Sequence, residues 1–233
     1  MTAVAAARHR ITPRDLEVLE FVARFGLVPG SAAARWAGTS RSVTYRREAR
    51  WREHRLVGVL PSVAGSGRLL TCTREGLLAV GREGLRPVRV SLGGVRHAAT
   101  VAWVAAELER RGEQVLSELE IMAIESREGR RLYSAELYDG RFHRPDLIVV
   151  EEGIGVEVEL TQKASWRLDS ILRGWRSAIG EDRLGGVRYL CADQAFRAVT
   201  LAVERTCSAE LIEVHRLGHK QITIDWSGDA ARP

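Results

Sequence analysis

Three of the five carboxylates in the segment 144–163, RPDLIVVEEGIGVEVELTQK, are placed to act together with its lysine. Two apolar, β-rich runs flank a short turn at 151–153, so we expect a β-hairpin. Because strand side chains alternate between the two faces of a sheet, Glu157 and Glu159 share one face. Asp146 lies beside them if the hairpin pairs in register. Carboxylates gathered in this way raise one another's pKa unless a cation joins them, and such an oxygen-rich cluster suits Mg²⁺ or Mn²⁺.

Two interpretations of this strand stay open. An antiparallel strand with one face in water would show the same alternation and would carry no chemistry. The placement of lysine favours a site, because only Lys163 and Lys220 of the 35 basic residues are lysine. Lys163 follows the acidic strand at the start of the next expected helix, and its compact ammonium group can steer a water or a phosphate oxygen.

The charge is divided unevenly along the 233 residues, which are enough for one large or two small domains. Residues 1–97 hold 17 basic against 7 acidic side chains, and residues 98–233 hold 18 against 23. A basic first third joined to an acidic remainder indicates a nucleic-acid-binding module and a second unit. The three cysteines are widely spaced, which argues against a disulfide framework or a structural zinc site. No apolar run approaches the roughly 20 residues of a membrane span and no signal peptide is recognisable, so we expect a cytoplasmic protein with no membrane partner.

The first third predicts three helices and a hairpin. A helix begins at Thr12 and ends at Gly26, a short second helix follows Pro29, and Thr39 or Ser40 caps a third. The runs VGVLPSV and RLLTCT, separated by a glycine-rich tip, form a β-hairpin. This is the order of a winged helix-turn-helix, in which the third helix enters the major groove of double-stranded DNA.

The third helix and the hairpin carry the residues that we expect to bind DNA. The apolar positions Val43, Ala49 and Leu56 leave the remaining side chains of the helix outward or flanking, where arginines can neutralise phosphates. The expected DNA-binding residues are Arg41, Thr44, Tyr45, Arg46, Arg47, Arg50 and Arg68. The alternative is a three-helix module whose arginines only solvate its surface or serve dimerisation.

The segment LRPVRVSLGG is the expected linker, which gives a DNA-binding domain over 1–94 and a second domain over 95–233. The second domain predicts a helix over 97–111, a strand through QVLSELEIMA, and a strand RLYSAELY that turns at Asp139-Gly140 into the acidic hairpin. A helix over 164–180, the strand VRYLCA, the helix DQAFRAVTLAVERT and the strand LIEVHRL follow. This order gives an α/β domain, a mixed sheet flanked by helices, and an α+β chain overall.

With RPD followed by EVELTQK and a helix, the second domain resembles the PD-(D/E)xK nuclease superfamily. The resemblance implies that Asp146 and Glu157 bind Mg²⁺ or Mn²⁺, with Glu118 as an additional upstream metal ligand. Glu159 stands where that pattern has its lysine, and Lys163 would supply the lysine's role from the next helix. The catalytic residues implied in this way are Asp146, Glu157, Glu159 and Lys163.

A winged helix is followed by HAATVAWV, then by RPDLIVV and EVELTQKASWRLDSILRGW. With these motifs the chain resembles, from about Ile11 to Ala192, the replication-relaxation family of bacterial plasmids and integrated mobile elements. The resemblance implies a DNA-binding protein of plasmid replication or maintenance with a nuclease-like domain. Two functions are left open: a regulator that binds double-stranded DNA without cutting it, and a Mg²⁺-dependent endonuclease or nickase directed by the winged helix. A homodimer is a candidate state, because a dimer is the usual way for a winged helix to read a palindrome.

Overall fold

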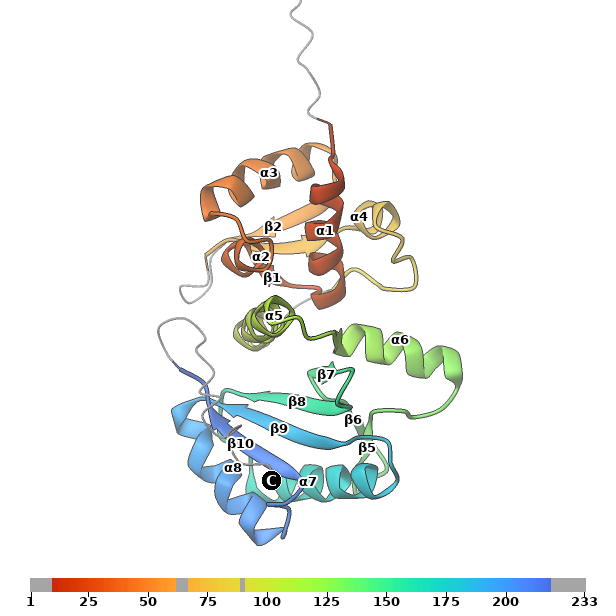
Figure 1. Cartoon of the computed structure of the whole chain (residues 1–233), viewed down its shortest axis with the longest axis vertical. Coiled ribbons are helices and arrows are strands. Elements are labelled where there is room, and N and C mark those ends of the chain that lie inside the picture. Colours follow the sequence, from red (N-terminus) through yellow and green to blue (C-terminus); the bar gives the residue numbers. More distant parts are fainter. Residues whose placement is uncertain (1–9, 62–66, 89–90, 219–233) are drawn as a thin grey trace, which may run out of the picture.

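The computed structural model describes residues 10–61, 67–88 and 91–218, which form two units on either side of the helix α5 (Val95–Arg110) (Figure 1). The first unit contains the helices α1 (Pro13–Phe25), α2 (Gly30–Trp36), α3 (Arg41–Glu53) and α4 (Arg74–Ala79). Its short strands are β1 (Val28–Pro29), β2 (Val57–Leu60) and β3 (Leu69–Cys72). They pair in the antiparallel order β1-β3-β2.

The helix starts expected in the first unit are confirmed. Thr12 and Asp15 form a capping box at the start of α1, and Ser40 caps α3. Gly26 follows α1 with a φ of +71°, a backbone conformation that glycine adopts without strain. The hairpin of β2 and β3 is also confirmed, with Leu60 opposite Leu69. The residues 62–66, where we expected the glycine-rich tip, lie outside the described residues, as do residues 89–90 of the expected linker.

The expected orientation of α3 was wrong in two places. Thr44 is only 2% exposed, whereas Ala49, expected in the core, is exposed. The buried face consists of Thr44, Glu48 and Trp51, at helical spacing i, i+4 and i+7. Trp51 fixes this face, because its indole packs inside the unit and donates to Asp15 at 3.1 Å.

The second unit is built on a five-stranded mixed sheet of order β10-β9-β8-β7-β4, so the expected mixed α/β fold is confirmed. The strands are β4 (Val115–Ser117), β7 (Leu147–Val149), β8 (Ile154–Glu159), β9 (Gly186–Cys191) and β10 (Ile212–Arg216). β8, β9 and β10 run parallel, whereas β7 is antiparallel to both of its neighbours. The helices are α6 (Glu118–Glu128), α7 (Ser165–Gly180) and α8 (Asp193–Arg205), and a separate two-stranded sheet joins β5 (Ala135–Glu136) to β6 (Phe142–His143).

The two faces of the large sheet bury different residues. Val156 and Val158 of β8 belong to a hydrophobic cluster that continues through α5 into α1 and α2. Tyr189 of β9 belongs to a second cluster, which includes Trp175 of α7 and Val199 of α8. Figure 1 shows α5 on one side of the sheet and α7 and α8 on the other. The sheet is therefore covered on both faces.

One expected strand was wrong for most of its length. QVLSELEIMA forms only the three residues of β4 before α6 begins at Glu118. The cause is local: Ser117 Oγ accepts from the Glu120 amide, and the Glu120 carboxylate accepts from the Ser117 amide at 3.0 Å. This reciprocal capping box starts a helix where side-chain alternation alone suggested a strand. The expected strand RLYSAELY is likewise reduced to the two residues of β5.

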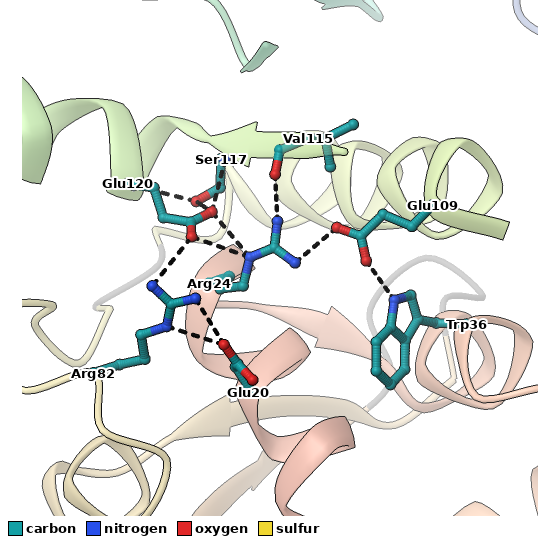
Figure 2. Close-up of polar contacts among 8 residues, drawn as sticks. All are labelled: Glu20, Arg24, Trp36, Arg82, Glu109, Val115, Ser117 and Glu120. Carbon is teal, nitrogen blue, oxygen red and sulfur yellow. Dashed lines mark hydrogen bonds and ion pairs between the residues drawn. The ribbon is translucent and has the colours of Figure 1, made fainter. Parts of the chain in front are cut away.

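A buried polar network joins the two units at the end of α1 (Figure 2). Arg24 binds Glu109 of α5 at 2.7 Å and Glu120 of α6 at 3.0 Å, and it donates to the carbonyl of Val115. Arg82 binds Glu120 at 3.6 Å from the loop after α4. Because these contacts come from both units and one apolar cluster contains residues of both, the two units pack against each other. Within the described ranges, no helix is long and apolar enough to cross a membrane.

Candidate functional site

The hairpin of β7 and β8 brings Asp146 to the expected acidic strand. Leu147 pairs with Val156, so Asp146 lies opposite Glu157. Its Oδ2 accepts a hydrogen bond from the amide of Val158 at 2.7 Å, which holds the carboxylate against the backbone of β8. Its Oδ1 lies 2.8 Å from Nε2 of His97 on α5. The expected register of the acidic hairpin is therefore confirmed, and both oxygens of Asp146 already have protein partners.

Glu157 and Glu159 share one face of β8, as expected, but that face is not in water. The two residues are 3% and 5% exposed, so the interpretation of this strand as a solvated one is wrong. His143 of β6 places Nε2 3.0 Å from Glu157 Oε1, an ion pair by distance without the alignment of a hydrogen bond. Glu159 is in contact with Lys163, four residues further along the chain.

Glu118 lies at the start of α6, where its amide donates to the carbonyl of Asp146 at 3.2 Å. Desolvation raises the pKa of Glu118, and the nearby charges of Asp146 and Glu157 raise it further. The structure thus brings all five expected residues, Glu118, Asp146, Glu157, Glu159 and Lys163, into one region at the β7–β8 hairpin.

Two histidines balance the negative charge of this region. The hydrogen bond to Asp146 raises the pKa of His97 above its ordinary value, against the opposing effect of burial. Burial lowers the pKa of His143, but the interactions with Glu157 and the charge of Asp146 together outweigh it, so this pKa is also raised. Both imidazoles therefore hold a proton more readily than a histidine in water does.

The expected metal site can be compared with these contacts. Carboxylate oxygens are the donors that Mg²⁺ prefers, so Asp146, Glu157 and Glu118 have suitable chemistry. In the part of the chain that the structure describes, no three His, Cys, Asp or Glu side chains are grouped as metal ligands. Asp146 is bound by His97, Glu157 is paired with His143, and Glu159 is held by Lys163. As arranged, the acids fit a set of paired charges better than they fit a metal centre.

The expected DNA-binding residues divide into two groups. Arg41 and Arg46 of α3 are exposed, and neither is ion-paired with another described residue. Arg47 and Arg50 instead reach back to the buried Asp15, at 3.9 and 3.3 Å, and so help to hold α3 on α1.

Arg68 and Tyr45, two further residues expected to bind DNA, meet where the start of β3 faces the middle of α3. Arg68 precedes β3 and binds the buried Glu48 at 3.2 Å, with its guanidinium 5.1 Å from the centre of the Tyr45 ring. Arg68 nevertheless keeps 56% of its side chain exposed. Arg41, Arg46 and Arg68 are therefore the most exposed to solvent of the residues expected to bind DNA, whereas Thr44 is buried.

Sequence reasoning missed His97 and His143. A signal was present, because His143 stands three residues before Asp146, and His97 begins the run HAATVAWV. Nothing in their spacing relates His97 to Asp146, 49 residues further along the chain. Their role depends on how α5 and β6 pack against the sheet.

No protein-family model matches this chain, and no curated protein is recognisably similar to it. Among solved structures, an O-methyltransferase from neocarzinostatin biosynthesis, crystallised with S-adenosyl-L-homocysteine, aligns at 15% identity with a TM-score of 0.21. The alignment covers 87% of this chain and 64% of the methyltransferase chain. So low a TM-score carries no argument about fold or activity.

Proposed function

We propose that this protein binds double-stranded DNA and acts in the replication or maintenance of a plasmid or mobile element, as a cytoplasmic relative of the replication-relaxation family. The first unit, residues 1–94, would act as a winged helix-turn-helix with α3 in the major groove. The order α1-β1-α2-α3-β2-β3 and the sheet order β1-β3-β2 support this assignment. The observation that carries it is the exposure of Arg41 and Arg46 on α3 together with Arg68 beside the hairpin.

We propose that residues 95–233, helix α5 together with the second unit, act as a PD-(D/E)xK nuclease-like domain that does not cut DNA. An antiparallel hairpin with Asp146 and Glu157, followed by a helix and a parallel strand, supports the likeness. The absence of cleavage is inferred from the paired acids. Metal-dependent cleavage of a phosphodiester would require Asp146 and Glu157 to exchange their contacts with His97 and His143 for contacts with a metal ion.

DNA binding is tested with a duplex selected from a random pool and measured by fluorescence anisotropy in EDTA. The double variant Arg41→Ala/Arg46→Ala should weaken binding by at least tenfold and lower the salt dependence by about two phosphate contacts. Arg197→Ala, at an exposed arginine of α8, is the control and should bind as the native protein does. Arg47 is not a clean probe, because its loss would also remove a partner of Asp15. Equal affinity of the double variant and the control would refute the role of α3.

A Mg²⁺-dependent endonuclease or nickase is the second candidate, favoured by the gathering of the expected acids and Lys163 in one region. Supercoiled plasmid would be incubated with the protein in Mg²⁺, Mn²⁺ or EDTA. The variants Asp146→Asn and Asp139→Asn remove one carboxylate each, and Asp139 is an exposed residue paired with Arg141. We expect no nicking by any of them. Metal-dependent nicking that is lost only in Asp146→Asn would establish the endonuclease and overturn the non-catalytic assignment.

A homodimer belongs to the same proposal, since two winged helices would read the two halves of a palindrome. Sedimentation with a palindromic duplex and with a single half-site distinguishes the states. Two copies per palindrome and one per half-site are expected, whereas one copy on both duplexes would exclude a dimer on DNA.

A further inference from the structure

Three exposed aromatic side chains lie on the β5–β6 sheet and α7, on the second unit. Tyr138, in the turn between β5 and β6, is 71% exposed, Phe142 is 40% exposed, and Trp166 of α7 is 69% exposed. The turn is fixed on α7, because the Tyr138 amide donates to Ser170 Oγ at 3.4 Å. Trp166, Ser170 and Arg173 lie at i, i+4 and i+7, so Trp166 projects from the side of α7 on which Tyr138 rests.

Arginines accompany these aromatic rings. The guanidinium of Arg173 lies 5.7 Å from the centre of the Tyr138 ring and binds its hydroxyl, and that of Arg131 lies 4.7 Å from the centre of the Phe142 ring. Such cation–π contacts hold a ring and a positive charge side by side. We call Tyr138, Phe142, Trp166, Arg131 and Arg173 the aromatic–arginine surface.

The acidic residues near these rings are largely paired with arginines. The buried Glu125 is shared between Arg131 and Arg144, each at 3.4 Å, whereas Glu136, opposite Phe142 in the β5–β6 ladder, is exposed. Asp139 is paired with Arg141, and Asp169 of α7 is paired with Arg205 of α8. Hydrogen bonds from these arginines lower the pKa of both carboxyls, so both stay ionised and neutralised at neutral pH.

The aromatic–arginine surface borders the acidic region. Phe142 is followed in β6 by His143, and since neighbouring strand residues point in opposite directions, the ring of His143 turns inward to Glu157 while Phe142 stays at the surface. At the other end, Trp166 stands three residues after Lys163, which holds Glu159. The surface is therefore joined to the paired acids through the neighbouring residues of β6 and of the segment before α7.

We propose that the aromatic–arginine surface binds single-stranded DNA by stacking unpaired bases on its rings. Every base offers a flat face to an exposed ring whatever its identity, and the adjacent arginines neutralise the phosphates between stacked bases. In a duplex the faces of the bases are stacked on one another, so this surface should prefer single-stranded DNA. Helix α3, in contrast, is proposed to bind the major groove of double-stranded DNA. The inference does not depend on DNA binding by α3.

The test uses the full chain and a labelled oligothymidylate of about 20 nucleotides, longer than the roughly 4–16 nucleotides that single-strand-binding folds cover. Trp166→Ala and Tyr138→Ala should each weaken binding about tenfold, and their combination further. Tyr138→Phe keeps the ring and should retain most of the affinity. Leu201→Ala, at an exposed apolar position of α8, is the control and should change nothing.

Duplex DNA and the α3 variant separate this surface from the proposed function. The ring variants should leave duplex binding intact, and Arg41→Ala/Arg46→Ala should leave oligothymidylate binding intact. Weak or absent single-strand binding by the native protein, or equal binding by the ring variants and Leu201→Ala, would overturn the proposal. Displacement of the oligonucleotide by unlabelled duplex as effectively as by unlabelled single strand would also overturn it. Circular dichroism of each variant confirms that the comparison is made between folded proteins.

Discussion

Replacement of Arg24 by methionine tests the network that joins the two units. The arginine and its partner Glu109 are each 14% exposed, and Glu120 is 8% exposed, so these charges are largely removed from water. The coulombic attraction of Glu120 and Glu109 raises the pKa of Arg24 in spite of its burial. Methionine retains the apolar stem of the side chain but leaves two buried carboxylates without their main cation.

The size of the effect follows from the contacts that remain. Breaking a buried ion pair costs about 3–5 kcal/mol, but Glu109 would keep Trp36 as a donor and Glu120 would keep Ser117 and Arg82. We therefore expect a loss of about 2–4 kcal/mol, near the lower end of that range. In a chain of this length the melting temperature should fall by about 4–16 °C.

Thermal and urea denaturation, followed by circular dichroism, measure this loss. Arg127→Met is the control, because Arg127 on α6 is 73% exposed and its pair with Glu128 should contribute less than about 1 kcal/mol. The second variant, Arg24→Met/Glu120→Gln, removes one orphaned charge while glutamine preserves the capping box, so it should recover part of the loss. If Arg24→Met is no less stable than Arg127→Met, or Glu120→Gln gives no recovery, the network does not hold the two units together.

Two further predictions concern the second unit. Burial would raise the pKa of Glu125, but hydrogen bonds from Ser134 and from the 132–134 amides lower it, so its stabilising effect is present at neutral pH and is lost as the pH falls below about 4.5. Glu125→Gln should therefore destabilise the protein at pH 7. Its free energy of unfolding should also fall less steeply than that of the native protein as the pH drops below about 4.5, and an equally steep fall would refute this. In α7, a Cβ on Gly174 would lie 2.7 Å from the Glu136 carbonyl oxygen, whereas a Cβ on Gly180 would meet nothing. Gly174→Ala should lower the melting temperature. Gly180→Ala should raise it slightly, because it should increase the free energy of unfolding by up to about 1 kcal/mol. Equal free energies of unfolding for the two variants in urea would contradict the packing of β5 on α7.

Local chemistry made much of the fold predictable. Thr12 and Ser40 start helices through hydrogen bonds to amides three residues away, and the acidic hairpin is set by two adjacent runs and their turn. The mistaken strand after Gln114 arose because two local signals compete in the same residues. Alternation suggested a strand, while the capping box of Ser117 and Glu120 favours a helix.

Of the residues in the candidate site, only the acidic ones were predictable from the sequence. Their alternation and the turn before them fixed Glu157 and Glu159 on one face and Asp146 opposite Glu157. The sequence did not predict whether that face contacts water, a metal ion or other side chains, because the elements that pack on it lie elsewhere in the chain. His97 comes from α5, and His143 comes from the separate β5–β6 sheet.

The sequence by itself determined the helix starts of the first unit, the uneven division of charge and the register of the acidic hairpin, because each can be taken directly from the residues in order along the chain. Only the tertiary structure decided which charges meet. Arg24 reaches Glu109 and Glu120 across 85 and 96 residues, and His97 reaches Asp146 across 49. Such pairs arise because packing the apolar faces of α1 and α5 brings their polar edges together. No local pattern encodes which edges those will be.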